Sequence, residues 1–388
     1  MDNRVLVLDA AQRSALSVVR SLGRAGLTVY TADAKQKALA GCSRYSKTYL
    51  KTPSPEDEPN AFLQWLEDLL AETPFSMVLP VTEVTSQLLL MNQERFPSGV
   101  FPFARYEQVM AMADKGELMA LADELGIPYP ATRRFAKADE LKLQALDYPC
   151  VIKPCLSRIY TGSGWIHTRV KVVENAEALE AELAASPYLA DYPFMIQAFV
   201  PGSGAGVFYL YGHGQPVANF AHRRVREKPP QGGVSVLSES VAVNPELSRY
   251  AELLLDHCQW HGVAMVEFRV TPDGQPYLME VNTRFWGSLQ LAVDAGVDFP
   301  LLLWQVHQSQ AIDRDWTYRI GQRLRWWLGD LDSLYIYCKG PYSAAQKLRR
   351  LFGFLLPSWR CRHEVNRFGD LKPAWYELTC YIKQLVGR

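Results

Sequence analysis

The sequence predicts a parallel α/β domain at its N-terminal end and a longer α+β region behind it. Short apolar runs at 5–8 and 27–31 are typical of buried strands, and apolar residues at helical spacing lie between them over 16–22. This strand–helix–strand order favours a parallel sheet. From 148 to 270 the pattern changes to strands joined by glycine-rich connections. A chain of 388 residues is also too long for one ordinary core.

The remaining elements of the N-terminal region follow in the same order. A helix is expected over 62–70, a strand over 77–81, and one long helix over 107–124 that ends before Gly126. The turn after the first strand, Asp9-Ala-Ala-Gln-Arg-Ser, lacks the glycines that let a dinucleotide pyrophosphate approach the backbone. We therefore reject NAD binding at this turn and expect a scaffold or substrate-side role for the domain.

Charge and apolar patterning exclude several classes of protein. Basic and acidic residues number 41 each, so no nucleic-acid partner is expected. No apolar stretch reaches the roughly 18 residues of a transmembrane helix, and the N-terminus lacks a signal-peptide pattern. The seven cysteines are scattered without a C-x-x-C pair, which argues against a disulfide framework. The cytoplasm is the expected compartment.

A hairpin over 263–285 carries the strongest functional signal. Its two strands are joined by Pro-Asp-Gly, a typical turn sequence. Side-chain alternation places Leu278, Glu280 and Asn282 on one face of the second strand. Glu267 lies in the middle of the first strand and can face the same point. Two carboxylates and an amide oxygen that converge suit Mg²⁺, whose shell is completed by water and phosphate oxygens. A ladder of ion pairs with two nearby arginines is the structural alternative.

This hairpin resembles the ATP-grasp superfamily. The stretch Met-Val-Glu-Phe, followed by Leu-Met-Glu-Val-Asn-Thr-Arg and Gly-Val-Asp-Phe-Pro, is similar to the carboxylate–amine ligase and carbamoyl-phosphate-synthase-like branches. The resemblance implies that Glu267, Glu280 and Asn282 hold Mg²⁺, with Mn²⁺ as the alternative ion, on the phosphates of ATP. It also implies that Arg284 contacts phosphate or the activated carboxylate.

The resemblance extends to earlier segments. It implies that Lys115 and Lys153 bind ATP phosphates, and that Lys153 contributes to catalysis. Gly162 and Gly164 would form a lid whose N–H groups curl around phosphate oxygens, with an ordinary hairpin loop as the alternative. The segment Met-Ile-Gln-Ala-Phe-Val-Pro-Gly resembles the strand that binds adenine through its backbone. The residues nearest to adenine would be Gln197, Phe199 and Val200.

Several arginines over 221–236 precede a Gly-Gly turn. Guanidinium groups pair well with carboxylates and phosphates. Related ligases direct the matching region to the acyl substrate, so we expect Arg224 to be a catalytic contact, followed in order of preference by Arg226 and Ser235. A solvated basic loop is the alternative.

The resemblance also implies the domain organisation. A pre-ATP-grasp α/β domain over 1–105 would precede two α+β subdomains of an ATP-grasp fold, over 106–195 and 196–310, and a C-terminal extension over 311–388. The extension contains 14 basic and 7 acidic residues and is rich in aromatic residues. We expect it to pack onto the body or onto a second copy in a homodimer. A basic amphipathic surface over 348–356, for a membrane or an acidic partner, is the alternative.

The implied reaction is an ATP-dependent ligation. A small-molecule carboxylate attacks the γ-phosphate of Mg-ATP to give an acyl phosphate, and an amine or similar nucleophile then displaces phosphate. Two other functions stay open: a carboxylase-type subunit that uses bicarbonate, and a nucleotide-binding regulatory or assembly protein with a weakened site. The latter is suggested by Ala198 and Ser203, which stand where the superfamily commonly has acidic residues.

Overall fold

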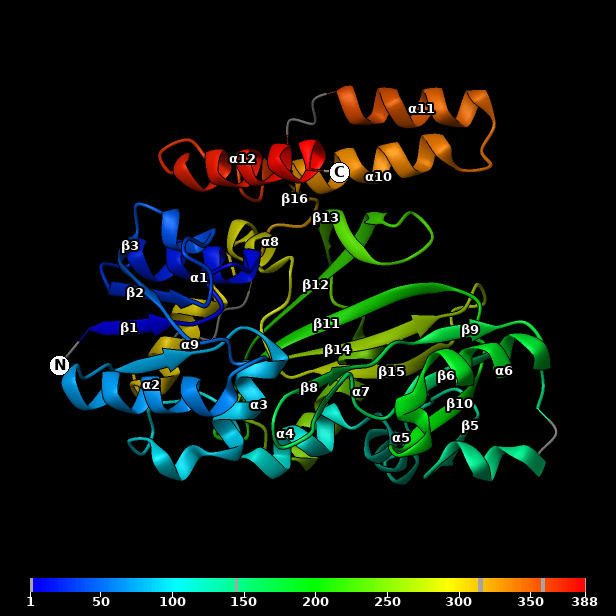
Figure 1. Ribbon diagram of the computed structural model, residues 1–388. Coiled ribbons are helices and arrows are strands. Elements are labelled where there is room, and N and C mark those ends of the chain that lie inside the picture. The colour runs from blue at the N-terminus through cyan, green and yellow to red at the C-terminus, as the bar shows by residue number, and fades with distance from the viewer. Residues whose placement is uncertain (1–2, 144–145, 313–316, 357–359, 388) are drawn as a thin grey trace.

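The computed structural model describes residues 3–143, 146–312, 317–356 and 360–387. At the N-terminal end, parallel strands form a sheet in the order β3-β2-β1-β4, drawn mostly in blue at the left of Figure 1. These strands are β1 (Arg4–Val7), β2 (Thr28–Asp33), β3 (Ser46–Lys51) and β4 (Met77–Leu79). The short helix η1 (Ala40–Cys42) lies between β2 and β3.

Both faces of this N-terminal sheet are buried, which explains the unbroken apolar run of β1. Val5 and Val7 pack in the cluster that contains α1 (Arg13–Arg24). Leu6 and Leu8 pack in the opposite cluster with α2 (Pro59–Glu72) and α3 (Glu83–Met91). A parallel strand covered by helices on both sides shows continuous rather than alternating hydrophobicity. The short helix η2 (Gln93–Arg95) follows α3.

The helix predicted over 107–124 is two helices, α4 (Tyr106–Ala113) and α5 (Lys115–Glu124). Asp114 separates them in an extended conformation, and its carboxylate accepts hydrogen bonds from the N–H groups of Gly116 (2.8 Å) and Glu117 (3.1 Å). An aspartate is a favourable N-cap, so it starts a new helix here despite the continuous helical spacing of apolar residues. The break makes Lys115 the first residue of α5.

A small antiparallel sheet follows, in the order β5-β10-β6-β9. Its strands are β5 (Thr132–Phe135), β6 (Cys150–Pro154), β9 (Lys171–Val173) and β10 (Phe194–Ala198). The helical elements beside it are η3 (Ala138–Leu143), α6 (Ala176–Ala185) and η4 (Pro187–Ala190). A separate hairpin projects from it, formed by β7 (Arg158–Tyr160) and β8 (Trp165–His167). The boundary expected at 195/196 falls inside β10.

The largest sheet has the order β15-β14-β11-β12-β13-β16-β17. Its first five strands are β11 (Ser203–Gly212), β12 (Gln215–Lys228), β13 (Val234–Val241), β14 (Gly262–Val270) and β15 (Pro276–Asn282). Helix α7 (Pro245–His257) packs with one face. Helices α8 (Leu289–Ala295) and α9 (Phe299–His307) pack with the other face, in the same core cluster as α1. The core cluster that contains α1, α8 and α9 therefore joins the N-terminal sheet to the largest sheet.

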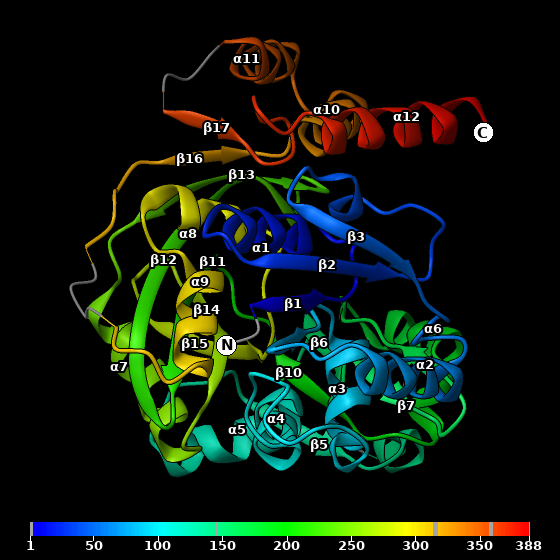
Figure 2. The same cartoon turned by 90° about the vertical axis from the view of Figure 1, so that its left-hand side faces the viewer.

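The C-terminal extension continues the largest sheet. Strand β16 (Arg323–Arg325) pairs with β13, and β17 (Cys361–His363) pairs with β16. Figure 2 shows both strands above β13, on the side of the molecule where the C-terminal helices lie. These helices are α10 (Trp327–Lys339), α11 (Ala344–Leu355) and α12 (Lys372–Val386). The extension therefore shares the backbone hydrogen bonds of the main body.

A buried ion pair fastens the extension to the first helix. Arg20 of α1 has no exposed surface, and its Nε donates to Asp370 Oδ2 at 2.7 Å. Its other nitrogens donate to the backbone oxygens of Glu364 (2.8 Å) and Val365 (2.9 Å). Asp370 also accepts from the backbone N–H of Arg44 at 2.9 Å. These hydrogen bonds satisfy both charges, as burial away from water requires.

Helix α11 turns apolar side chains outward. The residues concerned are Leu348, Leu351, Phe352 and Leu355, each of which is exposed. In Figure 1 this helix is the outermost element at the top of the molecule. Within the described residues, no helix is both long and apolar enough to cross a bilayer.

Candidate active site

Three predicted metal ligands lie together on one face of the β14–β15 hairpin. Glu267 and Glu280 are direct partners in the strand register, and Asn282 pairs with Met265 next to them. Asn282 Nδ2 lies 3.1 Å from Glu267 Oε1 and 3.4 Å from Glu280 Oε1. The alternation argument thus brings these three side chains to one point.

Strand alternation also predicted that Leu278 shares this face, and that prediction was wrong. A β-bulge interrupts the register after Glu267, so that Phe268 pairs with Leu278 and one extra residue, Met279, lies before Glu280. Leu278 therefore points to the opposite face, where it is buried with Phe268. A bulge shifts the inward–outward alternation of a strand by one residue. The backbone oxygen of Met279 accepts a hydrogen bond from Lys153 Nζ at 2.8 Å.

The two predicted phosphate-binding lysines approach this hairpin from different elements. Lys115 begins α5, and its Nζ lies 2.7 Å from Ser157 Oγ and 3.7 Å from Glu280 Oε2. Lys153 lies on β6 and is buried. Burial lowers the pKa of Lys153 to about 8, against the opposing influence of Glu280. Both cations therefore lie beside the carboxylates.

The electrostatics of the two carboxylates fit a divalent cation. Burial and the neighbouring Glu280 raise the pKa of Glu267 above its usual value. Burial would also raise the pKa of Glu280, but Lys115 and Lys153 hold it below its usual value. Two half-buried carboxylates that oppose each other in a strand pair repel, and a metal ion between them would remove that repulsion. The oxygen-rich donor set of Glu267, Glu280 and Asn282 suits Mg²⁺.

Arg224 lies at the hairpin, whereas Arg226 does not. Arg224 Nη2 donates to Glu267 Oε2 at 3.0 Å, and its Nη1 lies 3.3 Å from Glu227 Oε1. Arg226 instead donates to the buried carboxylate of Asp330 on α10 at 2.5 Å. The expectation that Arg226 faces the substrate is therefore wrong, because the C-terminal extension binds this side chain. Ser235 donates to the Leu237 backbone oxygen at 3.4 Å.

Other predicted residues lie apart from the β14–β15 hairpin. Gly162 and Gly164 are in the turn of the β7–β8 hairpin, whose Trp165 donates to the Pro55 backbone oxygen at 3.2 Å. Their hairpin thus rests against the N-terminal domain. Gln197 is buried on β10, where its side chain donates to Thr132 Oγ1 at 2.9 Å. Phe199 and Val200 follow directly after β10, and Phe199 is exposed.

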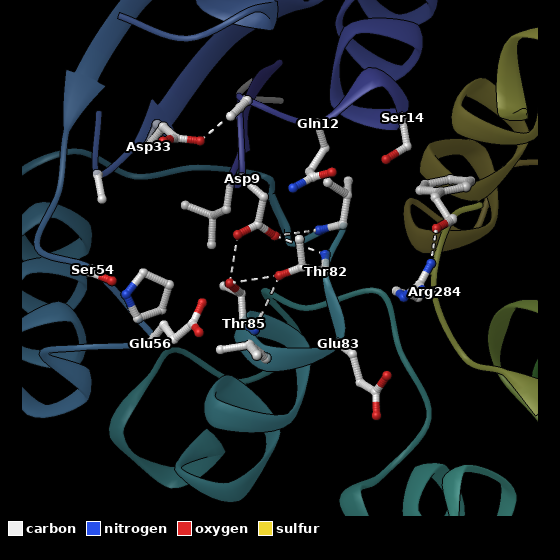
Figure 3. Close-up of a pocket in the computed structure, with 18 of the residues that line it drawn as sticks. Asp9, Gln12, Ser14, Asp33, Ser54, Glu56, Thr82, Glu83, Thr85 and Arg284 are labelled. Atoms are coloured by element: carbon white, nitrogen blue, oxygen red, sulfur yellow. Dashed lines mark hydrogen bonds between the residues drawn. The ribbon is translucent and has the colours of Figure 1, made fainter. Parts of the chain in front are cut away.

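Arg284 lies at the junction of two hollows. A small one of about 20 Å³ is lined by Lys115, Ser157, Glu280 and Asn282, together with Glu83 and Arg284. A larger cavity of about 540 Å³ is also lined by Glu83 and Arg284. Figure 3 shows these two side chains on the same side of the larger cavity. A ligand in the larger cavity can therefore reach the β14–β15 hairpin past them.

Sequence reasoning missed most of the residues in the larger cavity. Asp9, Asp33 and Thr82 lie at or just beyond the carboxyl ends of β1, β2 and β4. Asp9 accepts hydrogen bonds from the N–H groups of Val81 and Thr82, each at 2.9 Å, and from Thr85 Oγ1 at 2.6 Å. Ligands of open parallel sheets bind at this edge of the strands. The parallel order predicted from the sequence could therefore have identified this edge.

Comparisons with known proteins agree with the fold and the hairpin. Residues 191–326, which include the hairpin, match the sequence model of a family described as ATP-grasp in the biosynthetic pathway with Ter operon. No curated protein sequence matches the chain. This segment of the chain, which carries the hairpin, is therefore similar to the ATP-grasp family.

Three solved structures illustrate the likeness in fold. An L-amino acid ligase from Bacillus licheniformis is 18% identical, with a TM-score of 0.60 over 79% of this chain and 74% of that chain. A biotin carboxylase from Campylobacter jejuni is 16% identical, with a TM-score of 0.64 over 83% and 74%. A phosphoribosylamine–glycine ligase from Thermotoga maritima is 14% identical, with a TM-score of 0.60 over 82% and 78%.

Proposed function

We propose that this protein is an ATP-dependent ligase that activates a small-molecule carboxylate and joins it to an amine. The observation that carries the proposal is the convergence of Glu267, Glu280 and Asn282 beside two lysines, at a point that opens into the larger cavity. Carboxylates, an amide and buried cations together suit a metal ion and a polyphosphate, and the adjacent cavity has room for a second small molecule.

Each part of the site has a distinct task in this proposal. A divalent metal on Glu267, Glu280 and Asn282 would neutralise charge on the transferring phosphate. Lys115 and Lys153 bind the phosphate oxygens of ATP and hold them next to the carboxylates. Arg284, between the two hollows, orients the carboxylate that attacks the γ-phosphorus. Positioning of this kind supplies most of the rate gain in phosphoryl transfer.

The proposed chemistry has two steps. An oxygen of the substrate carboxylate forms a bond to the γ-phosphorus, and the bond from that phosphorus to the bridging oxygen of ADP breaks. The amine nitrogen then attacks the acyl carbon, inorganic phosphate leaves, and the nitrogen gives up a proton. An acyl phosphate is hydrolysed by water, so this step needs a closed site. The β7–β8 hairpin, which carries Arg158 and His167 on the wall of the cavity, is the element placed to close it.

The proposal is tested by ADP release from Mg-ATP in the presence of amino acids and other small carboxylates, alone and in pairs with amines. A ligase releases ADP only when both a carboxylate and an amine are present. Release with bicarbonate and an amine acceptor would indicate a carboxylase-type reaction instead. Nucleotide binding without turnover across the panel would favour a regulatory protein, and an absence of nucleotide binding would overturn the proposal.

Variants of the hairpin separate metal binding from folding. Glu280→Ala and the isosteric Glu280→Gln are expected to abolish ADP release while the circular dichroism spectrum is unchanged. Glu72→Gln is the matched control, because Glu72 is an exposed residue at the end of α2. Near-normal turnover of Glu280→Ala at saturating magnesium would show that the metal assignment is wrong.

A further inference from the structure

The N-terminal end of α1 opens into the larger cavity. Ala11, Gln12, Arg13 and Ser14 all line this cavity. The N-cap residue Gln12 makes no side-chain capping bond, and the first turn of α1 contains no acidic residue. Within the part of the chain that the structure describes, no acceptor is bound to the N–H groups of the first three helical residues. Such groups carry partial positive charge and attract anions.

Ser14 provides a second, independent indication of a ligand. The residue is only 6% exposed, it lines the cavity, and no described residue accepts or donates a hydrogen bond to its hydroxyl. Figure 3 shows Ser14 and Gln12 at the same end of the cavity, without a hydrogen bond drawn to either. A hydroxyl that has no protein partner and lines a cavity is available to a bound molecule.

Two charged or capped groups near this helix end are already bound. Arg13 binds Glu364, and its guanidinium lies 3.8 Å from the ring centroid of Trp326. The second helix that begins at the cavity, α3, has Thr82 Oγ1 as its cap and Glu83 in its first turn. An anion would be repelled there by Glu83. Asp33 accepts a hydrogen bond from the Ala11 N–H at 2.7 Å, so the N–H groups that follow Ala11 are the ones left to bind an anion at this helix end.

We propose that the substrate of the larger cavity carries a carboxylate or phosphate group, distinct from its reacting group, that binds at the N-terminus of α1 and to the Ser14 hydroxyl. This rests on the proposed function, in which the reacting end of that substrate lies near Arg284. The bound anion would accept hydrogen bonds from backbone N–H groups and from Oγ of Ser14. A substrate without such an anionic group would leave these donors unpaired and would be discriminated against.

The test replaces the anion by a fixed charge. Ser14 is the second residue of α1, and Ser14→Asp places a carboxylate at the helix end while favouring the helix itself. Ala345→Asp is the matched control, because Ala345 is exposed and is also the second residue of its helix, α11. The melting temperature of the full chain is measured with inorganic phosphate and with acetate, against sodium chloride at equal ionic strength. The series is run with and without a non-hydrolysable Mg-ATP analogue, which occupies the γ-phosphate position.

We expect a saturable rise in melting temperature for the wild type and for Ala345→Asp, no rise for Ser14→Asp, and a reduced rise for Ser14→Ala. A response to phosphate alone would identify a phosphate-bearing substrate, whereas a response to acetate as well would identify a carboxylate. An equal rise in the wild type and Ser14→Asp, or no saturable rise in either, would overturn the inference. Failure of the analogue itself to bind would count against the proposed function alone.

A different observation concerns the surface of α11. Its exposed apolar residues follow the spacing i, i+3, i+4 and i+7, and they are Leu348, Leu351, Phe352 and Leu355. A helix on a globular protein normally buries such a stripe. Here the inward face of α11 carries Phe354 and Arg350, and Arg350 donates to Asp330 at 2.9 Å.

The charge of α11 indicates what covers this stripe. Besides Arg350, which is bound to Asp330, the helix contains Lys347 and Arg349, and it has no acidic residue. An outward apolar stripe flanked by basic side chains fits an anionic lipid surface, in which the apolar residues enter the interface and the cations meet lipid headgroups. The geometry points to peripheral binding of the C-terminal extension to an anionic membrane.

Vesicle sedimentation tests this second inference. The full chain is expected to pellet with vesicles that contain phosphatidylglycerol and to remain in the supernatant with pure phosphatidylcholine. Phe352→Glu is expected to abolish pelleting. Leu253→Glu is the matched control, because Leu253 is an exposed apolar residue on α7, remote from α11. Equal pelleting of both variants, or a dimer in light scattering that Phe352→Glu dissociates, would overturn the membrane assignment.

Discussion

Lys153 Nζ donates a hydrogen bond to the backbone oxygen of Met279 at 2.8 Å, and this contact joins the small antiparallel sheet to the largest one at the β14–β15 hairpin. The oxygen is available because Met279 is the extra residue of the β-bulge. A lysine buried in this way contributes its charge only while it is protonated. The burial that positions Lys153 therefore also makes its charge sensitive to pH.

Nucleotide binding is expected to weaken at alkaline pH. Burial lowers the pKa of Lys153 to about 8, so its positive charge is present below that pH and is lost as the pH rises through it. The dissociation constant of an Mg-ATP analogue should rise by about tenfold per pH unit above that value, if only the charged form binds phosphate. Lys153→Arg, which stays protonated, should flatten this dependence in a calorimetric titration. The same slope in both proteins would contradict the role of Lys153.

Loss of Arg224 is expected to separate metal binding from catalysis. Its guanidinium lies 3.0 Å from Glu267 Oε2 and repels any cation on that carboxylate. Arg224→Ala should bind Mn²⁺ about tenfold more tightly without nucleotide, the order of one screened unit-charge interaction, yet release ADP more slowly. Free Mn²⁺ is measured by electron paramagnetic resonance. Arg223→Ala is the control, since Arg223 is largely exposed and pairs with Glu239 at 3.3 Å. Unchanged Mn²⁺ affinity in Arg224→Ala would refute the prediction.

The buried pair of Arg20 and Asp370 is expected to dominate the stability of the C-terminal attachment. Arg20→Met leaves Asp370 buried without its main cationic partner, and such a loss costs about 3–5 kcal/mol. Urea unfolding monitored by circular dichroism measures the effect. Glu67→Gln, which breaks the partly exposed pair with Arg95, should cost far less. Similar losses in the two variants would show that burial does not set the strength of the Arg20 pair.

The free energy of unfolding should fall as the pH is lowered, because His222 is buried in its neutral form. Burial, reinforced by Arg224, lowers the pKa of His222 from 6.5 to about 3, so the unfolded chain binds a proton that the folded chain does not. The stability gained from the neutral form is present above pH 6.5 and is lost as the pH falls towards 3. Between pH 6.5 and about 5, the wild type should lose about 2 kcal/mol more than His222→Gln. His257→Gln, a change at an exposed histidine, should keep the wild-type slope.

The convergence of the three side chains on the β14–β15 hairpin could be predicted because the information for it is local. Glu267, Glu280 and Asn282 belong to two strands joined by one turn, and strand alternation alone places them on a common face. The bulge at Met279 could not be predicted, because no residue type marks an extra residue in an antiparallel pair. It reversed the direction of Leu278 and created the acceptor for Lys153.

The rest of the site depends on contacts between distant segments. Helical spacing continues through 107–124, and only the capping bonds of Asp114 end one helix and begin another. Arg224 and Arg226 look equivalent in the sequence, yet the second is bound by Asp330, a residue 104 positions further along the chain. The larger cavity is formed by elements of the N-terminal sheet, the β7–β8 hairpin and the largest sheet, and spacing along the chain does not reveal their proximity.

The contact between Arg20 and Asp370 also has a consequence for the biosynthesis of the protein. A ribosome releases α1 early, but the acceptors of the Arg20 guanidinium group lie at 364, 365 and 370 and are synthesised 344 to 350 residues later. Throughout translation Arg20 must remain hydrated, because its burial without those acceptors would be costly. The N-terminal domain can therefore reach its final packing only after the segment that contains Asp370 has emerged, so that a product terminated before this segment would lack a completed first domain.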